Sequence, residues 1–473
     1  MSMFRLEECG GIRKNLFFAT AAQALNLVSA VLTSLVVPKV LGVGDYGYWQ
    51  LFSLYSGYSG IAMLGVNDGL VLRLAGKHLS EVNYHTFRGE LILVAFSQTV
   101  LLAILAVPLV VAWWGSPERL IVVVAVVVNG VICNITTFMS FLLQSVNLTH
   151  VQSKVSMVCR VAFFAMLLGL LSGGALGYVQ LIVASVLSQL GFLVLVCLYM
   201  RSLLNGACTD WKGAMRDIIA DSRSGFKVMV AYQADQLIVG VARSMVDVRW
   251  GVAVFGVFSF STSIVMFFLS FVSQLSTVFL PMIRRLGDGG AVRAAGEMRA
   301  VLNAVLPLGY LLYFPVRLLI SWWLPQYLAS ADFLAILLPI CFFDCKMNLL
   351  CGTYFKALRK EGYLLVVNLL TMLASSLLAA MSIFLLDNAH LAALSVVACI
   401  AVRSVASEVL LFRLYGVSVR RQLASEVLLA AFFEVSIVLF DAPIAFLVVL
   451  TIYYMVNRDS LQVVGRLIGL RHA

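Results

Sequence analysis

Four arginines lie in or at the end of long apolar stretches of this 473-residue chain: Arg160, Arg243, Arg317 and Arg403. A charge that faces lipid at the bilayer centre costs about 3 kcal/mol or more, so we expect Arg160, near the middle of its stretch, to face the protein interior. A guanidinium stays charged without water and binds paired oxyanion oxygens. The four arginines are therefore candidates for binding an anionic group. A structural ion pair is the alternative for each, with Asp247 as the partner of Arg243 at an outer rim.

Four acids also fall inside apolar stretches: Asp235, Asp344, Glu408 and Glu434. Transport driven by a proton or cation gradient needs a titratable group inside the membrane, and these acids are the available ones. The neighbouring cation Lys346 is expected to snorkel to the membrane surface or to pair with Asp344.

Other chemistries find no support in the sequence. The Gly76-Lys77 pair is followed by His78, so the chain lacks a phosphate-binding loop of the ATPase type. The five histidines fall at stretch ends, in connections or in the tail. Cys341 and Cys345 are one helical turn apart without a histidine or second cysteine pair nearby, so we expect neither a metal site nor a cofactor. The short outer connections argue against an enzyme.

The elements that carry these residues are membrane spans. Hydrophobic residues make up 62% of the chain and charged residues 12%, whereas charged residues make up about 25% of a soluble domain. A span needs roughly 20 mostly apolar residues. We predict an all-α integral membrane protein with about fourteen transmembrane helices, at residues 15–38, 46–67, 90–114, 120–144, 151–171, 176–200, 226–248, 251–283, 298–324, 330–353, 362–386, 390–412, 423–440 and 443–457.

The positive charges set the expected orientation. Most of the 33 Lys and Arg residues lie in the N-terminal segment, in every second connection and in the C-terminal tail. The positive-inside rule therefore places both termini in the cytoplasm. The net charge of +10 is explained by contact with anionic lipid and requires no nucleic acid.

The two halves of the chain contain a repeat. Gly42 and Gly47 align with Gly251 and Gly256, in each case at the start of a span on the same side of the membrane. The repeat is therefore parallel and predicts two six-helix lobes around a central cavity, as in transporters that alternate access to a central site. We predict an N-terminal six-helix lobe at residues 1–200 and a C-terminal six-helix lobe at 226–415, joined by an amphipathic cytoplasmic connection at 201–225. A terminal helix pair at 420–460 and a cytoplasmic tail at 461–473 follow.

Two further expectations concern this connection and the helix after it. Trp211, Met215 and Ile219 recur at helical spacing, which predicts a helix lying flat on the inner leaflet. The repeat places Asp235 opposite polar Asn26, which favours Asp235 as the coupling residue, and a salt bridge to a nearby arginine is the open alternative.

Short motifs at matching places in the span pattern resemble the polysaccharide flippases of the multidrug/oligosaccharidyl-lipid/polysaccharide superfamily, which includes O-antigen and lipid II flippases. The motifs are VPKVLG at 37–42, DYG at 45–47, GVNDG at 65–69 and YFKAL at 354–358. The resemblance implies a bacterial plasma-membrane protein that moves an undecaprenyl-pyrophosphate-linked oligosaccharide to the outer leaflet. It implies that cationic residues in a cavity bind the headgroup, and it allows other envelope-polysaccharide assembly proteins as partners.

One feature departs from the resemblance. Lipid II flippases carry an arginine in the first span, where this chain has Gln23, Asn26 and Ser29. This difference favours an O-antigen, capsule or similar glycan as substrate. A drug/cation antiporter of the same superfamily, a membrane glycan polymerase or glycosyltransferase, and a scaffold without transport activity are the alternatives.

Overall fold

The computed structural model describes residues 12–174, 176–206, 210–284, 288–358, 360–414, 416, 419–440 and 442–467, and these residues form helices and turns without a strand. The all-helical prediction is confirmed. The chain divides into two compact units, Met1–Gln233 (unit 1) and Ala234–Ala473 (unit 2). Residues 1–11 and 468–473, the ends of the predicted first lobe and tail, lie outside the described ranges.

The helices have the length and composition of membrane spans. Ten described segments can each cross a bilayer, or up to twelve if two bent helix pairs are counted. One segment, Trp211–Ser270, has 60 residues and is about 90 Å long at 1.5 Å per residue, far more than one crossing needs. It contains a break at Gly251, where two predicted spans meet. Each of the predicted spans coincides with a helical segment.

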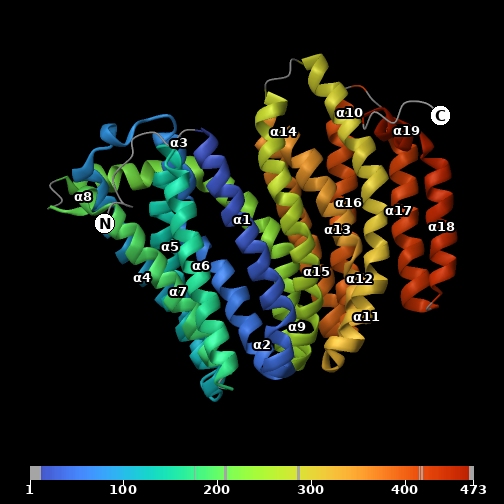
Figure 1. Ribbon diagram of the computed structural model, residues 1–473, viewed down its shortest axis with the longest axis horizontal. Helices are drawn as coiled ribbons and strands as arrows, with labels where there is room; N and C mark the ends of the chain where they lie inside the picture. Colours follow the sequence, from blue (N-terminus) through green and yellow to red (C-terminus); the bar gives the residue numbers. More distant parts are fainter. Residues whose placement is uncertain are drawn as a thin grey trace. The chain divides into compact units, whose positions relative to one another are not determined.

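Unit 1 contains eight α-helices and the first part of α9 (Figure 1). They are α1 (Ile12–Leu35), α2 (Val37–Tyr58), α3 (Val66–Leu74), α4 (Tyr84–Ala112), α5 (Pro117–Ser145), α6 (Thr149–Ser172), α7 (Tyr178–Tyr199), α8 (Arg201–Leu204) and α9 (Trp211–Arg284), with a 3-10 turn η2 (Ser59–Met63) after α2 and another, η3 (Leu79–Glu81), before α4. Phe87 and Phe138 stack in its core with ring centroids 5.5 Å apart.

The start of α9 packs closely on α3 inside unit 1. A methyl group placed on Gly69 would lie 1.9 Å from the carbonyl oxygen of Asp221, and one on Gly225 would lie 2.1 Å from that of Gly65. The Ser222 hydroxyl donates a hydrogen bond to the Leu64 carbonyl at 2.8 Å. Small residues four apart let two helix backbones approach this closely. The predicted amphipathic segment is therefore the first part of α9.

The exposed part of α9 in unit 1 carries an apolar stripe beside the exposed basic residues Lys212 and Arg216. Trp211, Met215 and Ile219 are each nearly half exposed, whereas Ala214 and Asp221 are buried. The helical spacing expected from the sequence is thus present, and contact of this face with the inner leaflet stays a prediction.

Unit 2 contains the rest of α9 and ten further helices (Figure 1). They are α10 (Asp288–Val305), α11 (Tyr313–Trp323), α12 (Ser330–Leu337), α13 (Pro339–Lys346), α14 (Thr353–Ala357), α15 (Glu361–Ala380), α16 (Ala389–Leu414), α17 (Arg420–Glu434), α18 (Pro443–Val456) and α19 (Arg458–Leu467). Two 3-10 segments, η4 (Leu306–Leu312) and η5 (Pro325–Tyr327), and three π-helical turns, η6 (Met347–Gly352), η7 (Met381–Leu385) and η8 (Val435–Leu439), interrupt these spans.

The aligned glycines share a backbone conformation. Gly42 has φ 72° and ψ 176°, and Gly251 has φ 81° and ψ 179°. This region of φ/ψ space is essentially restricted to glycine, because a side chain there clashes with the backbone. The repeat predicted from the sequence is therefore matched by the backbone: the breaks at Gly42 and at Gly251 have the same conformation.

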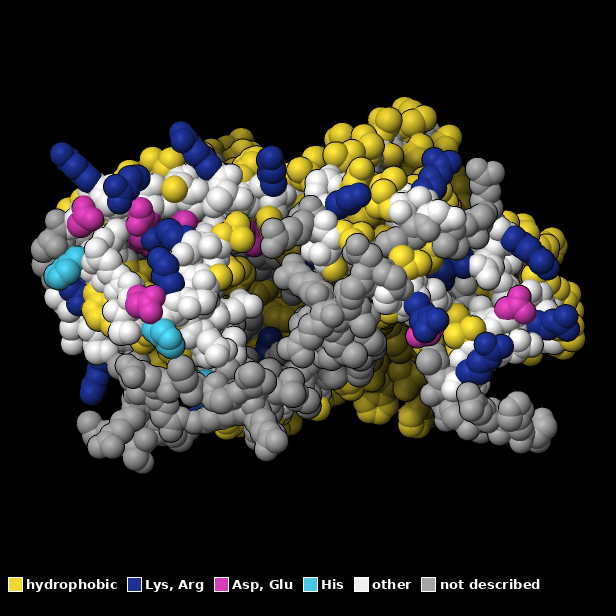
Figure 2. Space-filling model, turned by 90° about the horizontal axis from the view of Figure 1, so that it is seen from above, with side chains coloured by type: hydrophobic (Ala, Val, Ile, Leu, Met, Phe, Trp, Pro, Cys, Tyr) yellow, Lys and Arg dark blue, Asp and Glu magenta, His cyan; other side chains and the backbone are white. Residues whose placement is uncertain are grey.

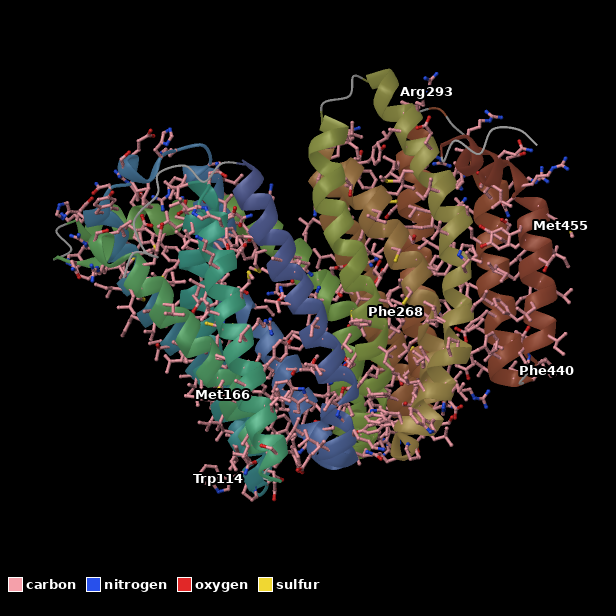
Figure 3. All side chains as sticks on the ribbon, in the orientation of Figure 1. Trp114, Met166, Phe268, Arg293, Phe440 and Met455 are labelled. Atoms are coloured by element: carbon pink, nitrogen blue, oxygen red, sulfur yellow. The ribbon has the colours of Figure 1, made fainter. Side chains whose placement is uncertain are left out.

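Lys and Arg side chains stand on the face seen in Figure 2. In unit 2, Arg293 and Phe440 mark opposite ends of the helices (Figure 3). In unit 1, Trp114 marks the end opposite α3 and α8 (Figure 3). The predicted orientation in the membrane stays a prediction.

Candidate functional site

Arg160 lies halfway along α6, about 17 Å from either helix end at 1.5 Å per residue. Arg160 is exposed in this unit, and the expectation that it faces the interior of the lobe stays a prediction. One guanidinium nitrogen donates to the Ser29 hydroxyl of α1 at 3.5 Å. Among the residues that the structure describes, no carboxylate forms an ion pair with Arg160. An exposed mid-span cation needs water or an anion as its partner.

Two further polar residues of α1, Asn26 and Gln23, lie about one and two helical turns before Ser29. The Asn26 amide nitrogen donates to the Gln23 side-chain oxygen at 3.4 Å, and the Asn26 oxygen is buried without a hydrogen-bond partner. At the start of α6, the Lys154 ammonium lies 4.8 Å from the centre of the Phe18 ring. Helices α1 and α6 pack along their length. They combine a guanidinium for an oxyanion with amides and a hydroxyl that suit sugar hydroxyl groups.

Arg403 on α16 has a different environment. It is only 3% exposed and forms ion pairs with Asp235 of α9 and Asp344 of α13. It also donates to the Asn368 side-chain oxygen at 3.3 Å. The open alternative of a salt bridge is therefore what the structure contains for both Arg403 and Asp235. A guanidinium held between two carboxylates has little capacity left for a phosphate, and Asp235 already has a fixed counter-ion.

Arg243 and Arg317 lie against aromatic rings. Arg243 is half-buried in α9, donates to the Ser259 hydroxyl at 3.3 Å and lies 5.6 Å from the centre of the Phe255 ring. Arg317 is exposed on α11, 6.0 Å from the centre of the Tyr313 ring. Headgroup binding by these two arginines stays a prediction.

Unit 2 contains a second buried network of charged side chains, which was not predicted from the sequence. Lys346 is fully buried, and its ammonium lies 2.7 Å from Glu408 and 2.6 Å from Glu426. Arg299 of α10 is also buried and pairs with Glu408. The expectation that Lys346 snorkels or pairs with Asp344 is wrong, because these two carboxylates of α16 and α17 converge on it.

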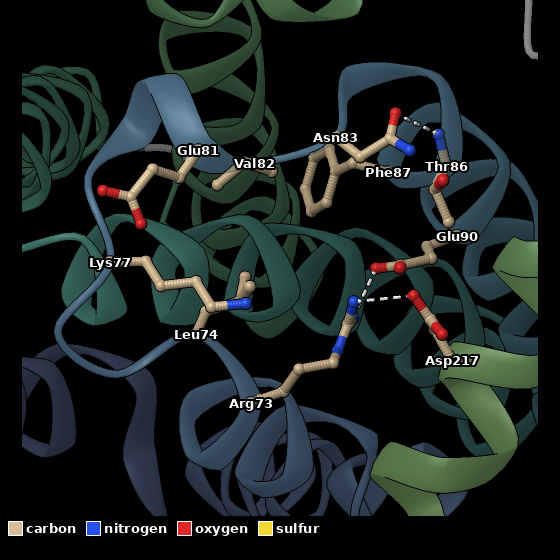
Figure 4. Close-up of a pocket in the computed structure, with 10 residues that line it drawn as sticks. All are labelled: Arg73, Leu74, Lys77, Glu81, Val82, Asn83, Thr86, Phe87, Glu90 and Asp217. Carbon is tan, nitrogen blue, oxygen red and sulfur yellow. Dashed lines mark hydrogen bonds and ion pairs between the residues drawn. The ribbon is translucent and has the colours of Figure 1, made fainter.

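Unit 1 has its own ion-pair cluster, which joins α3, α4 and α9 (Figure 4). Arg73 of α3 lies 2.9 Å from Glu90, 3.0 Å from Asp217 and 2.7 Å from Asp221. The cluster borders a cavity of about 180 Å³ that Lys77 and other polar residues line. Arg73 comes four residues after Gly69 and eight after Gly65, so it lies on the same face of α3 as these glycines. Its ion pairs link α3 to α4 and α9. The spacing of Gly65, Gly69 and Arg73 was the sequence signal from which this contact could have been predicted.

Comparison with known proteins concerns the fold. No protein-family model and no curated protein matches the sequence. The solved structure of the lipid II flippase MurJ in an inward closed conformation superposes with a TM-score of 0.58 at 13% identity, covering 96% of this chain and 99% of that chain. The chain has the fold of MOP-superfamily transporters. An inward-facing multidrug resistance MATE family transporter of that superfamily matches with a TM-score of 0.50 at 13% identity, covering 85% of this chain and 95% of the other.

Proposed function

We propose that this protein is a flippase that moves an undecaprenyl-pyrophosphate-linked oligosaccharide across the bacterial cytoplasmic membrane, for the synthesis of a surface polysaccharide such as O-antigen or capsule. The observation that carries the proposal is Arg160, an exposed mid-span arginine without an ion-pair partner among the described residues. The proposal includes both termini in the cytoplasm and, as partners, membrane lipids and other envelope-polysaccharide assembly proteins.

The charge of the substrate explains why such an arginine is needed. A pyrophosphate headgroup carries about two negative charges, and its lost hydration must be replaced by donors inside the membrane. The planar guanidinium of Arg160 can donate two parallel hydrogen bonds to phosphate oxygens. The neighbouring Ser29 and Asn26 supply a hydroxyl and an amide for the sugar. No step of this binding requires a cofactor.

The buried cations of unit 2 are less suited to binding the headgroup, because they are already paired with carboxylates. Arg403 and Lys346 are each surrounded by two carboxylates. Removing a buried cation from its partners leaves uncompensated charge at a cost of about 3–5 kcal/mol. A substrate would have to offset this energy in order to recruit them, whereas Arg160 has no such partner to lose.

A drug/cation antiporter is the second candidate, because a MATE transporter shares the fold. A cationic drug needs an available carboxylate. Asp235, Asp344, Glu408 and Glu426 are all held in ion pairs, which drug binding would have to break. Glu434, an acid without an ion pair among the described residues, would have to serve the antiporter instead. The four paired acids favour the anionic substrate.

The test is transbilayer movement of a fluorescent polyprenyl-pyrophosphate glycan in proteoliposomes. A charge-assisted hydrogen bond contributes about 1.5–3 kcal/mol, so we expect Arg160→Ala to slow movement by about 10- to 100-fold. Arg160→Lys should recover only part of the rate, because an ammonium lacks the paired donors. Arg293→Ala, which removes an exposed arginine at the end of α10, is the matched control and should move the glycan at the wild-type rate.

Other outcomes have distinct meanings. Wild-type movement by a normally reconstituted Arg160→Ala protein would contradict the proposed site. Gradient-driven uptake of a cationic dye without glycan movement would support the antiporter. Lengthening of the glycan would indicate a polymerase, and inactivity in all assays a scaffold.

A further inference from the structure

Glu434 is an acid of the terminal helix pair whose charge has no partner. It is the last residue of α17, about 21 Å along the helix from Arg420 at 1.5 Å per residue. Its Oε1 atom is buried without a hydrogen bond, and Glu434 forms no ion pair with any residue that the structure describes. Glu426, two turns earlier on the same helix, is bound to Lys346 at 2.6 Å.

Phe433, the residue before Glu434, lies in an aromatic cluster. The adjacent Phe433 ring is fully buried, with its centroid 4.7 Å from that of Tyr310, 6.1 Å from that of Tyr313 and 5.0 Å from that of Phe446. The Tyr310 hydroxyl is also buried without a hydrogen-bond partner. None of the described residues donates a hydrogen bond to Glu434 Oε1, so the structure shows no group that stabilises a charge there.

The titratable groups on the packed elements do not change this picture. Tyr310 of η4 packs on the ring of the adjacent Phe433. Cys341 of α13 is a neutral thiol, and the Tyr453 hydroxyl of α18 donates to the Asn303 carbonyl at 3.3 Å.

The charged side chains of α16 and α12, the other nearby helices, do not pair with Glu434. On α16, Arg403 and Glu408 are both in ion pairs. Asp332 of α12 is exposed.

Glu434 is partly exposed, and it lies within the candidate membrane span Arg421–Leu439. An ionised carboxylate without partners inside a membrane span is so costly that the group takes up a proton instead. We propose that Glu434 is a proton-binding site, protonated in the conformation described here and able to release its proton when η8 and α18 move away from it. The π-helical turn η8 begins at the next residue, and such turns are frequent at functional sites in helices. If the proposed flippase function holds, this site binds the coupling proton, in place of the ion-paired Asp235.

The proton can be observed directly by infrared spectroscopy of the full-length protein in lipid vesicles. We expect a carbonyl-stretch band of a protonated carboxyl group that shifts in deuterated water and decreases as the pH is raised. The band should be absent from Glu434→Gln and present in Asp332→Asn, which changes an exposed acid of the same unit. An unchanged band in Glu434→Gln would overturn the proposal, and so would a band that sodium ions abolish at constant pH.

Stability provides a second measurement that does not depend on the spectrum. Glutamine has nearly the same shape and neutrality as protonated glutamic acid, so Glu434→Gln should unfold at the wild-type temperature. Glu426→Gln removes the charge of an ion-paired acid on the same helix and should lower the unfolding temperature. Equal destabilisation by the two variants would show that Glu434 is ionised, which contradicts the proposal.

Transport then separates the two proposals. In the flippase assay, Glu434→Gln should move the glycan at a rate that no longer responds to a proton gradient. If the wild-type protein moves no glycan, the proposed function fails, while the infrared band still decides whether Glu434 binds a proton.

Discussion

Replacing Arg403 should damage folding more than it damages any binding step. Arg403→Gln keeps much of the side-chain length and can still hydrogen bond, but it removes the charge that faces two carboxylates. The variant leaves Asp344, with a side chain 12% exposed, and Asp235, with a side chain 33% exposed, next to each other without a cation.

The size of the effect follows from these exposures. A buried carboxylate that loses its partner costs about 3–5 kcal/mol, and this applies to Asp344. Asp235 is a third exposed and can be rehydrated, so its part of the interaction is worth at most about 1 kcal/mol. We therefore expect a loss of about 3–5 kcal/mol in the free energy of unfolding. This is a large fraction of the 5–15 kcal/mol typical of folded proteins.

The assay is thermal unfolding of purified protein in detergent, combined with the yield of monodisperse protein. Arg403→Gln should unfold at a lower temperature, and the double variant Arg403→Gln/Asp344→Asn should recover part of the loss, because it removes the stranded charge. A double-mutant cycle gives the coupling between the two residues. If Arg403→Gln is as stable as the wild type and loses glycan movement alone, then Arg403 acts on the substrate and the ion-pair interpretation is refuted.

Two further predictions concern glycines. Gly69→Ala places a methyl group 1.9 Å from the carbonyl oxygen of Asp221, so it should lower the free energy of unfolding by about 1–3 kcal/mol or more, measured by unfolding in detergent. Gly42→Ala and Gly251→Ala meet no atom within 4 Å but force alanine into a glycine-only conformation, so each should lose about 1–3 kcal/mol in the same assay. Gly44→Ala, with open space and no positive φ, is the control for all three. A loss at Gly42 without one at Gly251 would contradict the equivalence of the two turns.

The fold was largely predictable because spans are read from local composition. Apolar length sets where each helix crosses the bilayer, and every predicted span has a helical counterpart. Gly42 and Gly251 were recognisable as equivalent because a turn of this kind excludes other residues. The close contact between α3 and α9 was not predicted, since it joins residues far apart in sequence, such as Gly69 and Asp221.

The site was less predictable, because the role of a charge inside the membrane depends on what lies opposite to it. The sequence places Arg160 and Arg403 alike, each inside an apolar stretch. In the structure Arg403 meets Asp235 and Asp344 from two other helices, while Arg160 meets the Ser29 hydroxyl. Pairing of this kind between helices has no local signature, so composition alone could not separate a structural arginine from an available one.

Charged residues inside the membrane therefore indicate function only after those that form ion pairs with each other have been set aside. In unit 2, the three cations Arg299, Lys346 and Arg403 form ion pairs with four carboxylates, one negative charge more than the cations. These pairs have a structural role as links between α9, α10, α13, α16 and α17. After this subtraction, Arg160 in unit 1 and Glu434 in unit 2 stand out as charges whose partners are not supplied by the described residues. An available cation suits an anionic headgroup, and an available acid suits a proton. A proton-coupled flippase needs both, whereas a cation antiporter has no use for the arginine.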